Sequence, residues 1–330
     1  MAVATISEYS ASINTPQLIK ASMLIGGHPV NKNGRQIKYS GGFCVVFPYE
    51  TQTKKYAVRC WHINIEDIRI RTKLISDTIK SSKLPYFVGF EYVNEGLQTV
   101  QGPQDIVVMD WVNASPLKKY IADNLADACK INKLAISFKE MVADLHSHNI
   151  AHGDLQHGNI FVKDDGSIVL VDYDSMYVPS LSGYSDNIKG LAGYQHPSRS
   201  NNMELTEKID FFSELIIYTS LIALSKLPEL WFELNLEDTE TLLFSAEDIA
   251  SKGNSHVFNI LDNNVDLEPL SSKIKEYLEI DDINLLEPLE KVITDHNKIL
   301  ENLSEEWMDN GYVKKSHSFE DIASDISKNW

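Results

Sequence analysis

The residues best suited to chemistry lie close together in one segment, HGDLQHGNIFVKDDGSIVLVDYD, which spans residues 152–174. Apolar β-branched runs flank Asp165-Gly166 on both sides, which is a strong signal for a tight β-hairpin. A two-residue turn there predicts that Asn159 lies directly opposite Asp172, with Cβ atoms about 5 Å apart. An amide oxygen and a carboxylate so placed would suit Mg²⁺ that carries phosphate. Asp154, in the loop just before, could accept the proton of an attacking hydroxyl.

The elements that must position this segment divide the chain into two parts. Residues 1–112 contain four β-rich stretches, GGFCVVF, KYAVRCW, FVGFEYV and DIVVMDWV, and one helical stretch near residues 65–80. From about residue 116 the pattern becomes helical, with an apolar stripe along residues 131–145 and a nearly all-apolar helix after Asp210. The sequence therefore predicts a small β-rich part, a short crossing segment near residues 113–116 and a large helical part.

Composition and charge limit the classes of function. The net charge of −17 is uneven, since residues 1–112 carry 12 Lys and Arg against 9 Asp and Glu, and residues 113–330 carry 18 against 38. Nucleic acid and membranes are not expected partners, because both require a basic face. The acidity indicates a solvated surface, with attraction of a basic protein substrate as the alternative. Three scattered cysteines and the absence of a signal-peptide pattern in MAVATISEYS favour a cytoplasmic location.

The segment from His152 to Asn159, HGDLQHGN, resembles the catalytic loop HxDLxxxN of protein kinases. Asp172-Tyr173-Asp174 stands where the magnesium-binding DFG stands in that family, 18 residues after Asp154. The resemblance implies a bilobal α+β protein kinase-like fold, with an N-lobe at residues 1–112 and a C-lobe at residues 113–330. It also implies that Asp154 is the catalytic base, that Asn159 and Asp172 bind Mg²⁺ (or Mn²⁺), and that ATP is the phosphoryl donor.

The N-terminal part carries further motifs of the same resemblance. Gly41-Gly42-Phe43 resembles the tip of the loop that covers the phosphates, and Val46 would lie over the adenine. In Ala57-Val58-Arg59, Arg59 replaces the lysine that holds the α- and β-phosphates, and a guanidinium is larger and planar. Asp77 is the expected helix carboxylate that orients Arg59, with Glu66 as the alternative.

The hinge and the C-lobe are also similar to those of protein kinases. Met109 is expected to be the gatekeeper, and the backbones of Asp110 and Val112 would contact the adenine. Gly190-Leu191-Ala192-Gly193-Tyr194-Gln195-His196-Pro197 resembles the end of an activation segment. The resemblance implies that Asp210 holds the backbone of the catalytic loop, and His152 is interpreted as a packed loop residue.

Three departures from the family pattern bear on mechanism. Gly153 replaces the arginine before the catalytic aspartate, so control by activation-loop phosphorylation through that arginine is not expected. Gln156 replaces the loop lysine, which removes a cation from the γ-phosphate. Asp174 replaces the DFG glycine and is interpreted as a turn residue, with an extra metal contact as the alternative.

Three interpretations of the function stay open on the sequence. The first is a Ser/Thr protein kinase similar to the bacterial eukaryotic-like kinases, and a metal-dependent protein phosphatase is then a plausible partner. The second is a small-molecule kinase of the aminoglycoside or choline phosphotransferase type. The third is a nucleotide-binding pseudokinase scaffold. The segment that ends in GYQHP favours the protein kinase, because it resembles a surface that docks peptides.

Overall fold

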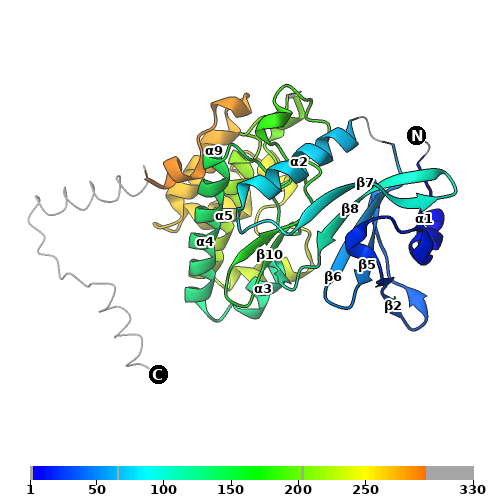
Figure 1. Ribbon diagram of the computed structural model, residues 1–330. Helices are drawn as coiled ribbons and strands as arrows, with labels where there is room; N and C mark the ends of the chain where they lie inside the picture. The colour runs from blue at the N-terminus through cyan, green and yellow to red at the C-terminus, as the bar shows by residue number, and fades with distance from the viewer. Residues whose placement is uncertain (1–2, 65–66, 202–203, 295–330) are drawn as a thin grey trace, which may run out of the picture. The chain divides into compact units, whose positions relative to one another are not determined.

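The computed structural model describes residues 3–64, 67–201 and 204–294. The chain divides into two compact units, residues 1–289 and residues 290–330. In the second unit the described residues, 290–294, form a helical turn in which the Thr294 hydroxyl donates to the Glu290 carbonyl at 2.8 Å. The remaining description concerns the first unit (Figure 1). Within the described ranges, no helix is long and apolar enough to cross a membrane.

The β-rich lobe is built on a six-stranded antiparallel sheet, in the order β1-β5-β6-β8-β7, with β4 paired to β5. Its strands are β1 (His28–Pro29), β4 (Tyr39–Ser40), β5 (Cys44–Glu50), β6 (Lys55–Trp61), β7 (Phe90–Thr99) and β8 (Gly102–Asp110). A small hairpin, β2 (Asn31–Lys32) and β3 (Arg35–Gln36), precedes β4. Helix α2 (Ile68–Ser82) packs against β7, where the Ser76 hydroxyl donates to the Phe90 carbonyl at 2.9 Å. The strands and the helix predicted in this part are confirmed.

The two faces of this sheet have different roles, because successive side chains of a strand point to opposite sides. On one face the sheet contributes a hydrophobic cluster, whose members on β5 and β6 are Val45, Phe47, Tyr49, Val58 and Cys60. The intervening residues, which include Val46 and Arg59, share the other face, and the register pairs these two directly. The predicted nucleotide-binding residues of the sheet are therefore separated from its hydrophobic cluster.

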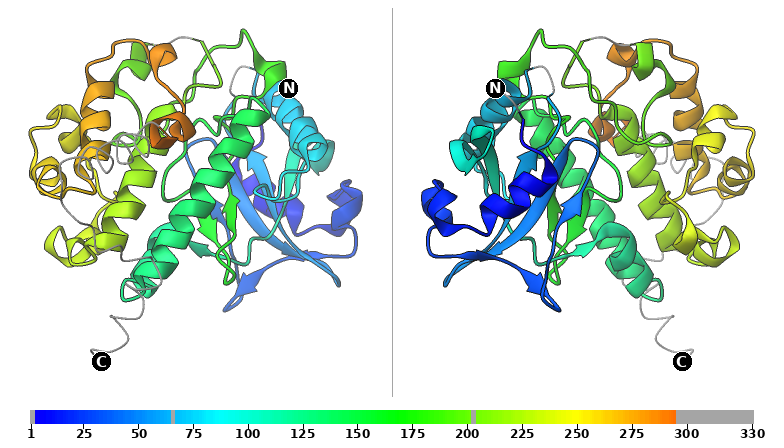
Figure 2. Two further views of the ribbon diagram at one scale, coloured as in Figure 1. Left: turned by 90° about the vertical axis from the view of Figure 1, so that its left-hand side faces the viewer. Right: turned by 90° about the vertical axis from the view of Figure 1, so that its right-hand side faces the viewer.

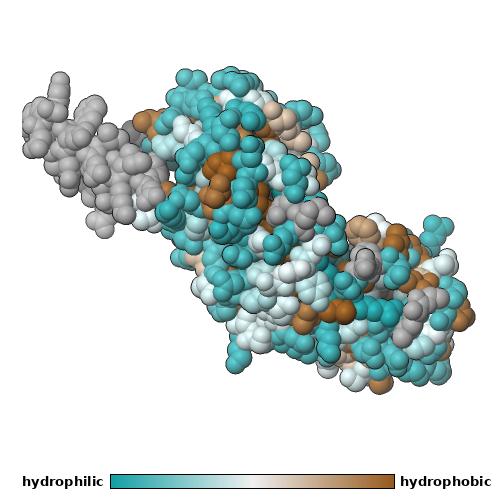
Figure 3. Space-filling view, turned by 90° about the horizontal axis from the view of Figure 1, so that it is seen from above, coloured by the Kyte–Doolittle hydropathy of each residue, from teal (hydrophilic) through white to brown (hydrophobic). Residues whose placement is uncertain are grey.

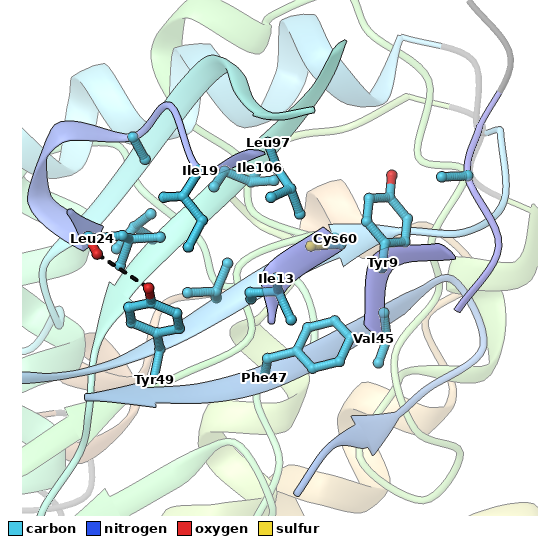
Figure 4. Close-up of a cluster of buried hydrophobic side chains, with 14 residues drawn as sticks. Tyr9, Ile13, Ile19, Leu24, Val45, Phe47, Tyr49, Cys60, Leu97 and Ile106 are labelled. Atoms are coloured by element: carbon cyan, nitrogen blue, oxygen red, sulfur yellow. Dashed lines mark hydrogen bonds between the residues drawn. The ribbon is translucent and has the colours of Figure 1, made fainter. Parts of the chain in front are cut away.

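The hydrophobic face is covered by the first residues of the chain (Figure 4). Helix α1 (Ile6–Ile13) begins with a capping box, in which the Glu8 N–H donates to the Thr5 hydroxyl and the Thr5 N–H donates to the Glu8 carboxylate. Two 3-10 helices follow, Pro16–Leu18 and Ser22–Leu24, and the Tyr49 hydroxyl donates to the Leu24 carbonyl at 3.1 Å. This cover was not predicted, since residues 1–112 were expected to be mostly strand.

Replacing Ile13 with alanine is expected to lower the free energy of unfolding by about 2–5 kcal/mol, as is usual for a buried isoleucine. Ile13 is 1% exposed and belongs to the cluster beneath the sheet. Urea denaturation of the full chain measures the change. The matched control is Ile25→Ala, because Ile25 is 69% exposed and should change the stability by less than about 0.5 kcal/mol. Equal effects of the two substitutions would contradict the packing described here.

The helical lobe is centred on α5, which is buried along most of its surface. Its helices are α3 (Leu117–Asp123), α4 (Ala128–Ser147), α5 (Phe211–Lys226), α6 (Leu230–Glu233), α7 (Ala246–Ala250), α8 (His256–Asp262) and α9 (Glu268–Leu278), with 3-10 turns at Pro179–Leu181, Pro197–Asn201, Leu236–Asp238 and Ile283–Leu285. Helices α4 and α9 both pack against α5, which explains its nearly uniform apolar sequence. The views in Figure 2 show this group of helices to one side of the large sheet. The face shown in Figure 3 is mostly hydrophilic, and its hydrophobic residues form small separate groups.

A three-stranded sheet in the helical lobe carries the segment between residues 152 and 174. Its strands are β9 (Ser115–Pro116), β10 (Ile160–Val162) and β11 (Ile168–Leu170), in the order β11-β10-β9. The predicted hairpin is present, but its predicted register is wrong: Ile160 pairs with Leu170 and Val162 with Ile168. The loop has three residues and ends at Gly166, which has a φ of +86°. A type I turn followed by a left-handed glycine shifts the pairing by one residue.

Candidate active site

The loop that carries Asp154 is held in place by Asp210. Asp210 is 1% exposed and immediately precedes α5, and its carboxylate accepts hydrogen bonds from the backbone N–H groups of His152 and Gly153. Burial raises the pKa of Asp210, and the hydrogen-bond donors oppose that shift. These contacts are the ones that the family resemblance implies for Asp210. They fix the backbone immediately before Asp154.

His152 connects this loop to the end of β11. Its ring is fully buried, Nδ1 accepts from the Asp154 N–H at 3.4 Å, and Nε2 lies 2.9 Å from the Val171 carbonyl oxygen. The Asp154 N–H requires an unprotonated Nδ1, so Nε2 carries the proton and donates to Val171. The residue before Asp172 is therefore linked through one ring to Asp154. His152 is buried, as its interpretation as a packed loop residue requires.

Asp154 and Asn159 are in direct contact. The Asn159 amide nitrogen donates to the Asp154 carboxylate at 2.9 Å and to the Asp154 carbonyl at 2.8 Å. The other carboxylate oxygen of Asp154 accepts from the Leu191 N–H, in the segment resembling the end of an activation segment, at 2.9 Å. Gly190 is close-packed here, because a Cβ at this position would lie 2.6 Å from the Asp154 carboxylate. Both oxygens of the candidate base therefore accept hydrogen bonds from the protein itself.

Asn159 and Asp172 each have a side-chain oxygen that could bind a metal ion. The two residues do not face one another across the hairpin, since the Asn159 carbonyl accepts from the Val171 N–H at 3.0 Å. Because Asn159 uses its amide nitrogen as a donor to Asp154, the amide oxygen is the atom that could bind a metal. Asp172 has a left-handed φ of +64°, and its side chain is 51% exposed. This donor set of hard oxygens fits Mg²⁺, whose other ligands would be water and phosphate oxygens.

Arg59 lies on β6, and its side chain reaches Asp172. Its side chain is 7% exposed, Nη1 is 3.1 Å from Asp172, Nη2 donates to Asp174, and Nε donates to the Cys44 sulfur at 3.0 Å. Burial alone would lower the pKa of Arg59, but the two carboxylates outweigh it and raise the pKa. The guanidinium is therefore charged and fixed by three partners.

The expected partner of Arg59, Asp77, is not in contact with it. Asp77 lies on the exposed side of α2, and Arg59 pairs with Asp172 and Asp174 instead. The alternative, Glu66, lies outside the described residues. The interpretation of Asp174 as a simple turn residue is also corrected, because its side chain is 9% exposed and forms an ion pair. The sequence contained one sign of the Arg59–Asp174 pair. Arg59 replaces the lysine of the family pattern, and Asp174 replaces its glycine, in the same chain.

The remaining predicted nucleotide-binding residues lie on or beside the large sheet. Gly41-Gly42-Phe43 forms the turn between β4 and β5, closed by a 2.9 Å hydrogen bond from the Gly41 N–H to the Cys44 carbonyl. Val46 pairs with Arg59, and Ala57 pairs with Met109. Residues paired across an antiparallel ladder share a face, so each pair projects to one side of the sheet.

The predicted hinge continues from Met109. The Asp110 N–H donates to the Gly89 carbonyl at 2.8 Å, and the Asp110 carboxylate pairs with Lys54 at 2.6 Å. Asp110 could therefore contact an adenine through its backbone carbonyl, but not through its N–H. Val112 lies between the end of β8 and the start of β9, where the chain crosses to the helical lobe. Both residues thus lie where the chain leaves the large sheet for the helical lobe.

A buried ion pair, Asp186–Arg199, was missed in the sequence. Both side chains are 1% exposed; Arg199 Nε lies 2.9 Å from one Asp186 oxygen and Nη2 lies 3.1 Å from the other. Arg199 Nη1 also donates to the Gly153 carbonyl at 2.5 Å and to Gln195. Arg199 thus links Asp186, in the segment after Tyr173, to the backbone of the catalytic loop at Gly153. The arginine of the family pattern is absent from position 153 and cannot make this link. No short-range sequence signal pairs these two residues.

Gly153 has a structural reason to be glycine. Its φ is +78°, and a Cβ at this position would lie 2.0 Å from the Ser175 carbonyl oxygen. A side chain would therefore be strained in its backbone and would collide with a neighbouring backbone. The absence of arginine at position 153 follows from the close approach of the segment that carries Asp174 and Ser175.

His196 predicts a measurable pH dependence of stability. Its Nδ1 accepts from the Ser198 N–H at 3.1 Å, so Nε2 carries the proton and donates to the Tyr277 carbonyl at 2.8 Å. Burial lowers the pKa of His196, so the folded state binds a proton less readily than the unfolded state. The free energy of unfolding should therefore decrease as the pH falls below about 6.5, the ordinary pKa of histidine. His196→Gln should reduce that slope in urea denaturation, and an unchanged slope would contradict this role of His196.

Comparisons with known proteins agree with this geometry. The family model described as the protein kinase domain matches residues 40–258. A probable serine/threonine-protein kinase, PknB, of Lactococcus lactis is 26% identical over 125 residues, which are 36% of this chain and 20% of that protein. A probable serine/threonine-protein kinase, zyg-1, of Caenorhabditis elegans is 26% identical over 200 residues, which are 57% of this chain and 27% of that protein. The matched segments thus span less than a third of either relative. The family match covers most of the chain and includes strands β5 to β8, Arg59, the catalytic loop and Asp210, and the chain therefore belongs to the protein kinase family, with its bilobal α+β fold.

Proposed function

We propose that this protein is a Ser/Thr protein kinase that transfers the γ-phosphoryl group of MgATP to a protein hydroxyl. The observation that carries the proposal is the arrangement of four polar residues around one space. Asn159 contacts Asp154 at 2.9 Å, Arg59 contacts Asp172 at 3.1 Å, and Val171 links the two pairs through its bond to Asn159. A base, a metal-ligand pair and a fixed cation are the parts that phosphoryl transfer needs.

Each residue of the site would have a separate role in phosphoryl transfer. Bound MgATP would supply the phosphoryl group, with Asn159 and Asp172 as the protein ligands of the metal. Arg59 would neutralise charge on the phosphates, and Asp154 would accept the proton of the substrate hydroxyl. Asp210 and His152 hold the loop in place, so most of the catalytic effect would come from positioning.

A small cavity beside Asp154 supports a protein substrate over a small molecule. Its volume is about 310 Å³, and its wall includes the Gly190 that packs on Asp154. Most of the exposed lining is apolar, with Ala192, Ala246 and Ile249 among its residues, and Lys189 and Gln195 also line it. Such a cavity fits one apolar side chain next to the phosphorylated residue of a peptide. We also propose that the substrate is basic, because of the acidic helical lobe, and that a metal-dependent protein phosphatase acts with the kinase.

One observation favours a second candidate, a protein that binds nucleotide without transferring phosphate. Both carboxylate oxygens of Asp154 accept hydrogen bonds from the protein, one of them from Leu191 in the segment that a substrate would have to pass. Transfer requires that Leu191 moves away from Asp154 when a substrate binds. A scaffold would keep this contact.

Intact-mass spectrometry after incubation with Mg²⁺ and ATP tests the proposal. We expect gains in steps of one phosphate, on the chain itself or on an added basic protein, and no gain for Asp172→Ala. The nucleotide-dependent rise of the melting temperature is measured on the same samples. Binding without any phosphate gain on several proteins would favour the scaffold, and phosphate found only on small molecules would favour the small-molecule kinase.

A further inference from the structure

The two carboxylates of the Asp172-Tyr173-Asp174 segment lie in different environments. The Asp174 side chain is 9% exposed and is buried against the Arg59 guanidinium, which is 7% exposed. The Asp172 side chain contacts the same guanidinium at 3.1 Å, but is 51% exposed. One carboxylate is therefore enclosed with Arg59, and the other is available to solvent and to a metal.

A metal would change the balance between these two contacts. When Asp172 binds Mg²⁺, its charge is shared with the ion, and its attraction for Arg59 weakens. Asp174 keeps its contact, because it is on the buried side of the guanidinium. Cys44 binds the third nitrogen, Nε, at 3.0 Å. A planar guanidinium can hold all three partners in a fixed geometry, whereas a lysine ammonium is a point charge on a flexible stem.

Helix α2 does not supply a competing carboxylate. Its one acid, Asp77, is exposed, and its buried charged residue is Arg71, whose side chain donates to the Ser185 carbonyl at 2.9 Å. The buried charge of α2 near this site is therefore positive, like that of Arg59. Within the described part of the chain, the buried carboxylate that pairs with Arg59 comes from the segment that follows β11.

We propose that Asp174 is the positioning residue for Arg59: it holds the guanidinium beside Asp172 while Asp172 binds the metal. The inference rests on the proposed function, since it assigns Arg59 to the nucleotide phosphates. The cation of the site is then anchored by the same short segment that carries the metal ligand. A displacement of helix α2 would leave Arg59 in place.

Calorimetric titration of the full chain with MgATP tests this assignment. Asp174→Asn keeps the shape of the side chain and should weaken binding about tenfold, the effect of one hydrogen bond to a charged group. Arg59 would then depend on Asp172, so the Mg²⁺ concentration needed for half-maximal ATP binding should rise. The matched control, Asp77→Asn, removes an exposed acid from α2 and should change neither quantity. In an Arg59→Gln background, Asp174→Asn should weaken binding less than about twofold.

Two results of the titration would contradict the assignment of Asp174 as the positioning residue. An equal loss in both backgrounds, or a loss in Asp77→Asn, overturns the assignment. If Asp174→Asn does not fold, Asp174→Glu provides the comparison, because it keeps the buried charge but moves the carboxylate by one methylene. If the unaltered chain binds no MgATP, the proposed function fails, and the positioning role fails with it. A urea-denaturation cycle on Arg59 and Asp174 then shows separately whether the pair stabilises the fold.

Discussion

Replacing Asp154 with asparagine is expected to lower phosphoryl transfer by about 10²–10⁴-fold, the contribution typical of a general base. Asparagine has the same shape, but it cannot take the proton of the substrate hydroxyl. It also has one acceptor oxygen for the two donors, Asn159 and Leu191, that bind the carboxylate. The initial rate of phosphate incorporation into a basic protein, followed by mass, measures the effect.

Nucleotide binding separates this role from a role in the metal site. Asp154→Asn should bind MgATP with nearly the affinity of the unaltered chain, because Asn159 and Asp172 are still present. Asp172→Ala should lose both binding and transfer. If Asp154→Asn lost binding to the same extent as Asp172→Ala, the assignment of Asp154 as the base would be wrong.

Removing Arg199 should have the largest effect on stability. Arg199→Ala leaves Asp186 buried and without its guanidinium, and breaking a buried ion pair in this way usually costs about 3–5 kcal/mol. The Gly153 carbonyl and Gln195 also lose a donor. Urea denaturation measures the loss. The rate of transfer should fall as well, because Arg199 holds the backbone next to Asp154.

Two further variants show whether breaking the Asp186–Arg199 ion pair causes the loss of stability in Arg199→Ala. Lys189→Ala removes the other cation that contacts Asp186, at 2.8 Å, but Lys189 is 37% exposed and its loss should cost less than about 1 kcal/mol. The double substitution Asp186→Leu with Arg199→Met removes both buried charges and should recover most of the stability lost in Arg199→Ala. A double variant as unstable as Arg199→Ala would show that the contact with Gly153 is the dominant one.

Regular elements could be predicted because local patterns determine them. Residues 131–145 carry an apolar stripe at helical spacing, and they lie within α4 as expected. The apolar sequence after Asp210 became α5, which neighbouring helices cover. The N-terminal cover was missed because its helices are short and their apolar residues meet the sheet only in three dimensions. Residues 1–27 also have little β-pattern of their own.

The site could be predicted as a set of residues, but its contacts could not. The hairpin was expected with a two-residue turn at Asp165-Gly166, but the loop also includes Asp164 and ends at the left-handed Gly166, which changes the register. The partner of Arg59 was sought on α2, because the family pattern places it there. The pairs that the structure adds, Arg59–Asp174 and Asp186–Arg199, join residues 115 and 13 positions apart. Such pairs depend on tertiary packing, which no short-range spacing reveals.

The cover formed by the first residues sets a practical limit on how the chain can be cut. The stretch matched by the family model starts at residue 40, well after the helix that contains Tyr9 and Ile13. A recombinant fragment that started there would expose one continuous apolar surface, built from Val45, Phe47 and their neighbours. Patches of this kind drive association between molecules and precipitation. The failure of an inactive, insoluble fragment would therefore result from the missing cover and not from the chemistry of the candidate active site.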